Sequence, residues 1–183
     1  MGAPARESGQ SGARSLIVLA ALAGCLALQP SRGGQAADRC ESPLARVVSV
    51  QGLVQVQPAG SSEWLPARLD DRLCIGDTVR IGDLARAALA LANDSVLRFD
   101  ERTTLRLAGE PESGRSLLDL LFGEVHFFSH RPRALEVDTP IANASTEGTE
   151  FLMRARPERT EVVLFEGRVR LASAAGEVLL ASG

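Results

Sequence analysis

Apolar and polar residues alternate along most of this 183-residue chain, and turn-forming residues interrupt the alternation at short intervals. Runs such as VQVQ at 54–57 and VLRF at 96–99 are separated by Gly, Asp, Asn and Pro about every 8–12 residues, which is typical of a many-stranded all-β domain. No segment of helix length lies between these runs, so a parallel βαβ architecture is excluded. The sequence therefore predicts one compact all-β domain of about ten to twelve short strands.

Three architectures fit this spacing: a β-roll, a short β-helix and a sandwich. A glycine follows most of the expected strands, which favours a coiled roll. Two segments are ambiguous. The alanine-rich stretch 85–92 would suit a helix but is short and lies between turn signals, so we expect a strand. Residues 116–121 fit either one helical turn or a strand, and Gly123 follows both.

The first 37 residues are typical of a secretory signal peptide. Arg6 and Arg14 precede an uncharged run from Leu16 to Leu28, and small residues ending at Ala37 provide a cleavage site. This run of 13 residues is too short to span a bilayer as a helix. A second processing site competes with Ala37, because LAGC at 22–25 resembles a lipobox in which Cys25 is lipidated. We therefore expect a periplasmic or secreted protein, with a membrane-tethered lipoprotein as the alternative.

Cleavage after Ala37 leaves a domain of residues 38–183, which is long enough for a core without metals. Its formal charge falls from −3 to −5, because three arginines and one glutamate are removed. A mildly acidic domain with interspersed charges argues against a nucleic-acid surface. Two cysteines remain, Cys40 and Cys74. In an oxidising compartment this pair predicts a disulfide, and two unpaired thiols are the alternative.

The sequence offers no pattern typical of an enzyme or a cofactor site. His126 and His130 are the only histidines, and on an extended strand their α-carbons lie about 13 Å apart, too far to bind one metal ion. There is no nucleophile elbow, and the Gly-Asp units lack the following helix that a phosphate site requires. The scattered carboxylates are typical of a solvated face. We expect no catalytic residue, cofactor or metal.

The sharpest local features are EGTEF at 147–151 and the FEG sequence at 165–167. A structural interpretation gives Gly148 a bend, Phe151 a core position and residues 166–167 a hairpin turn. A functional interpretation places residues 143–150 in a loop at a partner-binding edge, with Asn143, Glu147 and Glu150 as contacts. The nearby turn at 130–133 adds Arg131 and Arg133, whose guanidinium groups suit acidic groups on a partner.

Nine segments occur in the order typical of one family, and together they cover about residues 45–183. They are VQG at 50–52, Trp64, GDTVR at 76–80, ARAA at 85–88, NDSVL at 93–97, GEV at 123–125, VDTP at 137–140, EGTEF at 147–151 and FEGRV at 165–169. In these segments the chain resembles the FecR-like domain family. Cys40 and Cys74 also resemble the cysteine pair of an exported subgroup.

This resemblance implies a sensing or binding role. Regulatory members of the family are anti-sigma proteins of the inner membrane, but only about 15 residues precede the apolar run here, too few for an anti-sigma segment. The chain is more similar to stand-alone exported FecR-like proteins. Family domains normally run on beyond the position of Gly183, so the natural protein continuing past this residue is an open alternative.

The predicted function is therefore an exported, non-enzymatic envelope domain that binds another, unidentified envelope protein through strand edges or loops. A module that binds cell-wall glycan is the first alternative, although Trp64 is the sole tryptophan and tyrosine is absent. An anti-sigma-type regulator of iron uptake is a further alternative.

Overall fold

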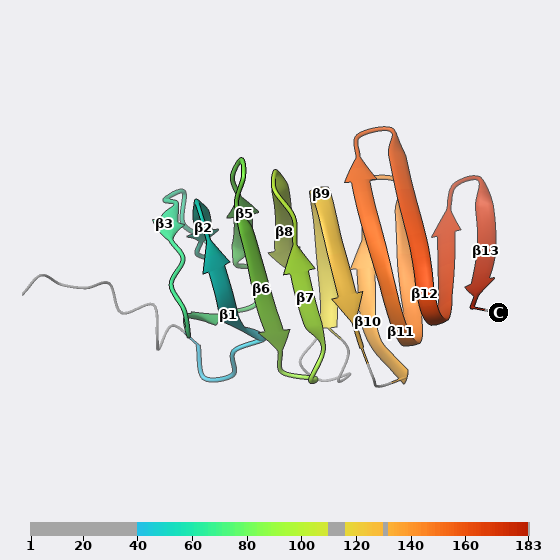
Figure 1. Cartoon of the computed structure of the whole chain (residues 1–183), viewed down its shortest axis with the longest axis horizontal. Helices are drawn as coiled ribbons and strands as arrows, with labels where there is room; N and C mark the ends of the chain where they lie inside the picture. The colour runs from blue at the N-terminus through green and yellow to red at the C-terminus, as the bar shows by residue number, and fades with distance from the viewer. Residues whose placement is uncertain (1–39, 110–115, 130–131, 183) are drawn as a thin grey trace, which may run out of the picture. The chain divides into compact units, whose positions relative to one another are not determined.

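The computed structural model describes residues 40–109, 116–129 and 132–182, which belong to one compact unit spanning Gly34–Gly183. These residues form thirteen strands in one sheet (Figure 1). The strands are β1 (Ala45–Gln51), β2 (Val54–Gln57), β3 (Leu65–Pro66), β4 (Arg72–Leu73), β5 (Thr78–Ile81), β6 (Arg86–Leu91), β7 (Val96–Phe99), β8 (Thr103–Leu107), β9 (Ser116–Phe128), β10 (Pro132–Asp138), β11 (Ala142–Arg156), β12 (Arg159–Ser173) and β13 (Gly176–Ala181).

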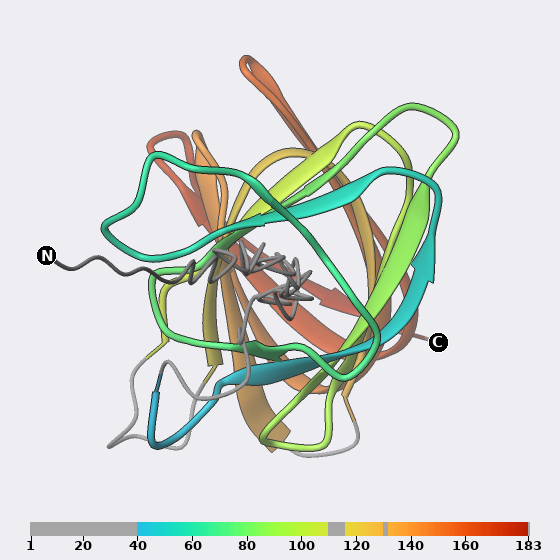
Figure 2. The same ribbon diagram turned by 90° about the vertical axis from the view of Figure 1, so that its left-hand side faces the viewer.

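The sheet is coiled so that it forms two facing layers. One layer runs from β3 through β2, β5 and β8 to the first part of β9. The other runs from β4 through β1, β6 and β7 to the last part of β9. Viewed end-on, the strands wrap around a common axis (Figure 2). The predicted all-β class is confirmed, and the coiled arrangement is that of a roll. A β-helix needs parallel ladders, but β9–β10 is the only parallel pair among the described strands.

Long strands that bend join the two layers. The first part of β9 pairs with β8 and its last part pairs with β7, and the bend falls at Gly123. Gly123 has a φ of 105°, and a Cβ there would lie 2.4 Å from the Cα of Thr103. At Gly167 of β12 a Cβ would lie 2.1 Å from the carbonyl oxygen of Gly148 in β11. Only glycine allows two backbones to pass this closely.

Alternating residues of both layers fill the core between them. Phe127 of β9 and Phe151 of β11 are fully buried, and their rings stack with centroids 4.6 Å apart. The register places them opposite each other across the β9–β11 ladder. Leu89 and Leu97 make a similar buried pair across β6 and β7. The predicted core position of Phe151 and the predicted strand at 85–92 are thus confirmed.

A disulfide joins Cys40, which precedes β1, to Cys74, which follows β4, with Cα atoms 5.9 Å apart. The prediction of this pair is confirmed. Because β1 and β4 are also paired at Ala45 and Leu73, the bond reinforces one end of the sheet. It closes a loop of 34 residues, which stabilises the fold by about 3–4 kcal/mol on a chain-entropy basis.

Two local predictions were wrong. Residues 143–150 do not form a loop, because they lie within β11 and pair with β12 on one side and with β10 or β9 on the other. Residues 166–167 do not form a hairpin turn, because β12 continues through them to Ser173. The turn before β11 is made instead by Thr139–Ala142, whose main chains are hydrogen-bonded at 2.8 Å. Long-range pairing overrides the local turn preference of Asn, Ser, Thr and Gly in both segments.

Residues 116–121 belong to a strand, which was one of the two alternatives for this segment. The described residues form thirteen strands, slightly more than the ten to twelve expected. The predicted signal peptide at 1–37, including Cys25, lies outside the described residues. Among the described residues there is no helix long and apolar enough to cross a membrane.

Candidate functional site

The predicted partner-binding residues do not gather into one site. Asn143 is half-buried in β11, and its amide donates to Glu136 at 3.2 Å and to Asp138. Glu147 also lies in β11, within the paired ladder. Arg133 lies in β10 rather than in a turn, and Arg131 is outside the described residues. Glu150 alone among them has a described side chain in a surface cluster, which the following paragraphs define.

That cluster is the outward face of three neighbouring strands, which we call the aromatic face. Register places its members side by side, since Phe128 is opposite Glu150, His126 is opposite Leu152, and Leu152 is opposite Val163. The next outward residue of β12 is Phe165. Val163 and Phe165 are 50% and 51% exposed. The aromatic face consists of His126 and Phe128 of β9, Glu150 and Leu152 of β11, and Val163 and Phe165 of β12.

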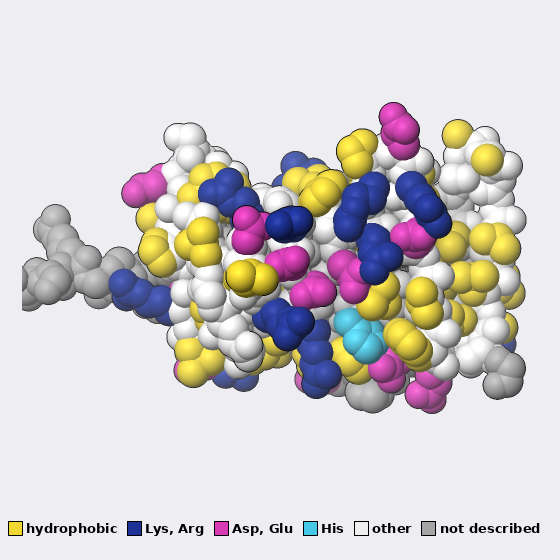
Figure 3. All heavy atoms as spheres, turned by 45° about the horizontal axis from the view of Figure 1, so that its top comes forward, with side chains coloured by type: hydrophobic (Ala, Val, Ile, Leu, Met, Phe, Trp, Pro, Cys, Tyr) yellow, Lys and Arg dark blue, Asp and Glu magenta, His cyan; other side chains and the backbone are white. Residues whose placement is uncertain are grey.

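His126 lies at the centre of the aromatic face. Its ring centroid is 4.1 Å from that of Phe128 and 5.2 Å from that of Phe165, so it is held between two phenyl rings. Its Nε2 lies 3.0 Å from a carboxylate oxygen of Glu150. On the far side, the Arg98 guanidinium of β7 covers the Phe128 ring at 4.7 Å. Figure 3 shows the histidine among hydrophobic side chains, bordered by arginines and acidic residues.

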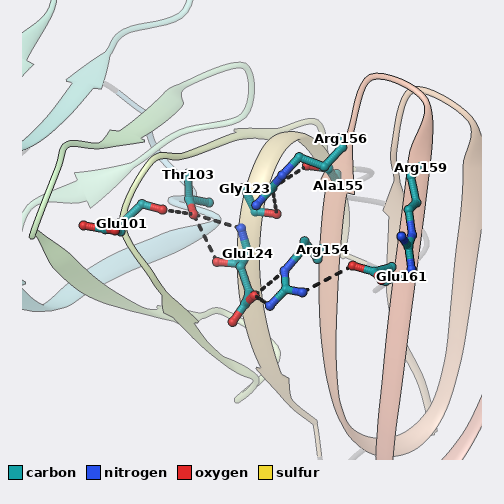
Figure 4. A network of polar contacts seen from close by, with 9 residues as sticks. All are labelled: Glu101, Thr103, Gly123, Glu124, Arg154, Ala155, Arg156, Arg159 and Glu161. Atoms are coloured by element: carbon teal, nitrogen blue, oxygen red, sulfur yellow. Dashed lines mark hydrogen bonds and ion pairs between the residues drawn. The ribbon is translucent and has the colours of Figure 1, made fainter.

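A row of paired charges borders the aromatic face along the same strands (Figure 4). Arg154 of β11 donates from Nε to Glu124 of β9 at 2.6 Å, and its Nη1 lies 3.3 Å from Glu161 of β12. Arg159 also pairs with Glu161. The main chain of Glu124 is also held, because its N–H donates to the Thr103 hydroxyl at 3.0 Å. These contacts fix the charged side chains on the surface of three strands.

The row is electrostatically satisfied. The hydrogen bond that Arg154 donates to the Glu124 carboxylate, followed by the negative charges of Glu124 and Glu161, raises the pKa of Arg154 above its usual value. Arg154 therefore stays charged at any physiological pH. Beside it, the Arg156 guanidinium lies 4.7 Å from the ring of Phe122. An apolar centre with a rim of paired arginines and carboxylates is the composition typical of a protein-binding surface.

Trp64, the residue on which a glycan site would depend, does not offer a free ring face of this kind. The Arg80 guanidinium lies 4.0 Å above the Trp64 ring, and Arg80 also donates to Gln55 at 2.8 Å. A sugar stacking on that face would have to displace Arg80. Within the described ranges no group of three or more His, Cys, Asp and Glu side chains is arranged to hold a metal ion.

Glu150 was expected at a binding surface from the sequence, whereas His126, Phe165 and the arginines around them were not. The sequence does contain a pattern that indicates this surface, namely the alternation of outward and inward residues along two strands. In EVHFF at 124–128 every second residue faces outward, and the same holds in EVVLF at 161–165. Each run therefore begins its outward row with a glutamate and ends it with a phenylalanine. What the sequence did not indicate is that the two runs are separated by a single strand.

The fold defines the protein as an all-β roll built from one coiled sheet. Over residues 77–170 the sequence matches the family described as FecR protein. The chain belongs to the FecR protein family, which confirms the resemblance seen in the sequence motifs.

Two crystal structures of one protein from Parabacteroides distasonis ATCC 8503, at 1.65 and 2.50 Å resolution, resemble this fold. That protein is described as a "putative anti-sigma factor". Each structure has a TM-score of 0.52 and 20% sequence identity, and the match covers 57% of this chain and 50% of that chain. This chain thus spans half the length of that protein, and at this identity the likeness concerns the fold. No curated protein matches the sequence.

Proposed function

We propose that this protein is an exported, non-enzymatic module of the bacterial cell envelope that acts by binding another protein, in signalling, regulation or envelope assembly. The aromatic face is the proposed binding surface. The proposal assigns it no catalytic residue and no cofactor.

The observation that carries this proposal is the exposure of Val163 and Phe165 side by side on one strand, at 50% and 51%. Apolar residues scattered singly over a surface need no explanation, whereas contiguous ones mark interaction sites. Phe165 is an aromatic anchor, and Arg154 and Arg159 provide polar contacts at its rim. Aromatic residues and arginine are the types that dominate binding energy at protein interfaces.

A protein partner suits this surface better than a glycan. The one exposed phenyl ring of the aromatic face is Phe165, which has no polar group, and Trp64 is covered by Arg80. Glycan recognition would need exposed aromatic faces with hydrogen-bonding groups around them. Here the charged groups around the apolar centre are already paired with one another.

Export is supported by the signal-peptide pattern at 1–37 and by the disulfide between Cys40 and Cys74. Structural disulfides form and persist in oxidising compartments. The intact mass of the protein from envelope fractions tests this part. A chain starting at Asp38 is expected, and a lipid-bearing Cys25 would place the protein on a membrane surface. A Met1 start with free thiols would contradict export.

The binding proposal is tested by placing a photoreactive phenylalanine analogue at position 165 in living cells. We expect adducts with another protein from position 165. The matched control is the same analogue at Leu84, which is 92% exposed but lies in a turn far along the chain. Equal adducts from both positions, or none from position 165, would contradict the proposal.

A substitution sharpens the result. Phe165→Arg places a charge in the apolar centre and should abolish the adduct formed by the analogue at position 163, while Leu84→Arg should leave it unchanged. Because Phe165 is half exposed, its replacement should not unfold the protein, and an unchanged thermal transition verifies this. An adduct that survives Phe165→Arg would exclude the aromatic face as the binding surface.

A further inference from the structure

Within the part of the chain that the structure describes, the strand β13 is paired on one side only. Residues 176–181 pair with β12 at residues 168–173, and no other described strand lies beyond them. Natural edge strands are usually protected by Lys, Pro, a bulge or an inward-pointing charge. The sequence of β13, GEVLLA, contains no Lys or Pro. Its one charged residue is Glu177, which forms an ion pair with Arg170 of the same chain.

The main-chain hydrogen bonds between β13 and β12 involve every second residue, and they show which main-chain groups of β13 face away from the sheet. The N–H of Ser182 donates to the carbonyl of Gly167 at 3.1 Å, so residues 178 and 180 are the ones whose main chains bond to β12. The N–H and C=O groups of Glu177, Leu179 and Ala181 therefore point to the side that is not paired with β12. These three residues offer a complete antiparallel ladder to another strand.

Apolar side chains accompany this ladder on both faces of the sheet. Leu179 is 57% exposed on one face. On the other face Val178 is 51% exposed and lies opposite Leu171, at a groove of about 410 Å³ that Ile141 also lines. The apolar side chains that line this groove beside β13 are thus open to solvent. Burying this surface would favour association.

We propose that a second copy of this chain occupies the β13 edge, with the two β13 strands antiparallel about a twofold axis at Leu179. In this register Leu179 faces Leu179 of the second copy, and Glu177 faces Ala181 of the second copy. Val178 faces Leu180 of the second copy, so apolar residues meet apolar residues at every inner position. The two Glu177 carboxylates stay apart, each beside its own Arg170. The edge is therefore compatible with a second copy of itself, because no like charges meet and the hydrogen-bonding groups and apolar side chains are matched.

The strand pair alone makes a small contact. Stable interfaces bury about 800 Å² on each partner, which is more than a six-residue strand pair supplies alone. The apolar opening beside Val178 and Ile141 adds to the buried surface. We therefore expect an association that depends on protein concentration, not an obligate dimer. The aromatic face lies on other residues, so this inference stands or falls separately from the proposed function.

Sedimentation of the protein purified from the full-length chain tests the proposal. The unaltered protein should approach twice the mass of one chain as its concentration rises. Leu179→Arg and Leu179→Asp should each remain monomeric, because each places like charges opposite each other on the axis. An equimolar mixture of the two variants should recover the doubled mass, since opposite charges then meet. Leu84→Arg, which adds the same charge elsewhere, should dimerise like the unaltered protein.

The mixture of Leu179→Arg and Leu179→Asp separates a loss of the twofold contact from a loss of folding. A protein that stays monomeric at all concentrations would overturn the proposal, whether or not position 165 gives adducts with another protein. A dimer that persists in Leu179→Arg would also overturn it, because the twofold contact would then lie elsewhere. Leu179 is more than half exposed, so loss of folding in its variants is not expected, and an unchanged thermal transition checks this.

Discussion

The two halves of this protein expose apolar residues in different ways. In the N-terminal half, from β1 to β8, the exposed leucines Leu53, Leu69 and Leu84 lie singly in bends and turns between short strands. In the C-terminal half, from β9 to β13, exposed apolar residues lie next to one another on strands, as Val163 and Phe165 do. The N-terminal half is also reinforced by a disulfide, whereas no described strand pairs with the outer side of β13.

This difference supports the division of roles that the proposed function and the proposed dimer assign to the two halves of the sheet. The short strands and their turns close the N-terminal end around buried residues, and isolated leucines at turn tips have little consequence for association. The long bent strands of the C-terminal half carry their outward rows across several neighbours, so apolar side chains accumulate there. We therefore expect substitutions in the N-terminal half and at the bends to lower stability, and substitutions on the C-terminal surface to change association.

The largest expected effect is at the bend that joins the two layers. Gly123→Ala combines a positive φ with a Cβ 2.4 Å from the Thr103 backbone, and should cost about 5 kcal/mol in unfolding free energy. Gly60 is the matched control, because its φ is 74° and a Cβ there meets nothing within 4 Å. Gly60→Ala should cost about 1 kcal/mol. Equal losses in urea unfolding would show that the close approach at Gly123 is not what constrains the bend.

Two phenylalanines of the C-terminal half, one in the core and one on the surface, should respond differently to replacement by alanine. Phe151 is fully buried against Phe127, so Phe151→Ala should cost about 4 kcal/mol. Phe165 on the adjacent strand is half exposed, and Phe165→Ala should change the unfolding free energy by less than about 1 kcal/mol. Chemical denaturation of both variants measures the difference. A large loss in Phe165→Ala would mean that the aromatic face holds the fold together, not a partner.

The disulfide tests the N-terminal half. Replacing Cys40 and Cys74 together by serine should lower stability by about 3 kcal/mol through the loop of 34 residues. Hydrogen exchange should increase first in β1 and β4, which the bond reinforces. The C-terminal strands serve as the internal control in the same experiment. Uniform loss of protection across all strands would show that the two halves unfold as one unit and would weaken the comparison.

The smallest expected effect is a gain. Leu84 has a φ of 53° in a turn and is 92% exposed, so its side chain contributes little packing while the backbone is strained. Leu84→Gly should raise the unfolding free energy by about 0.5–1 kcal/mol, because glycine adopts this conformation freely. The main-chain N–H of residue 84 keeps its bond to Glu101 in the variant. A fall in the thermal midpoint would mean that Leu84 makes a contact that its exposure does not reveal.

The sequence predicted most of the fold class because alternation is a local property. The strand at 86–91, the core position of Phe151 and the cysteine pair all follow from residues read within short windows or from compartment chemistry. Residues 143–150 were misread because Asn, Ser, Thr and Gly favour turns locally. Their extended form comes from pairing with strands on both sides, and one of those, β9, lies earlier in the chain.

The candidate site was less predictable for the same reason. Glu150 and His126 are 24 positions apart and meet only because β9 and β11 are neighbours in the sheet. β10 lies between these strands in the chain, so adjacency in sequence would have suggested a different pairing. The outward rows that begin at Glu124 and Glu161 are visible in the sequence, but their alignment depends on bends at Gly123 and Gly167.

Hydroxyl-radical footprinting would show whether only the C-terminal half contacts other proteins, as the proposed function and the proposed dimer require. The oxidation of each side chain would be compared between the purified protein at low concentration and the protein in the cells that produce it. We expect protection of Val163, Phe165 and Leu179 in cells, with Leu53 and Leu84 oxidised equally in both samples. Protection of the N-terminal leucines, with the C-terminal residues unchanged, would contradict this expectation.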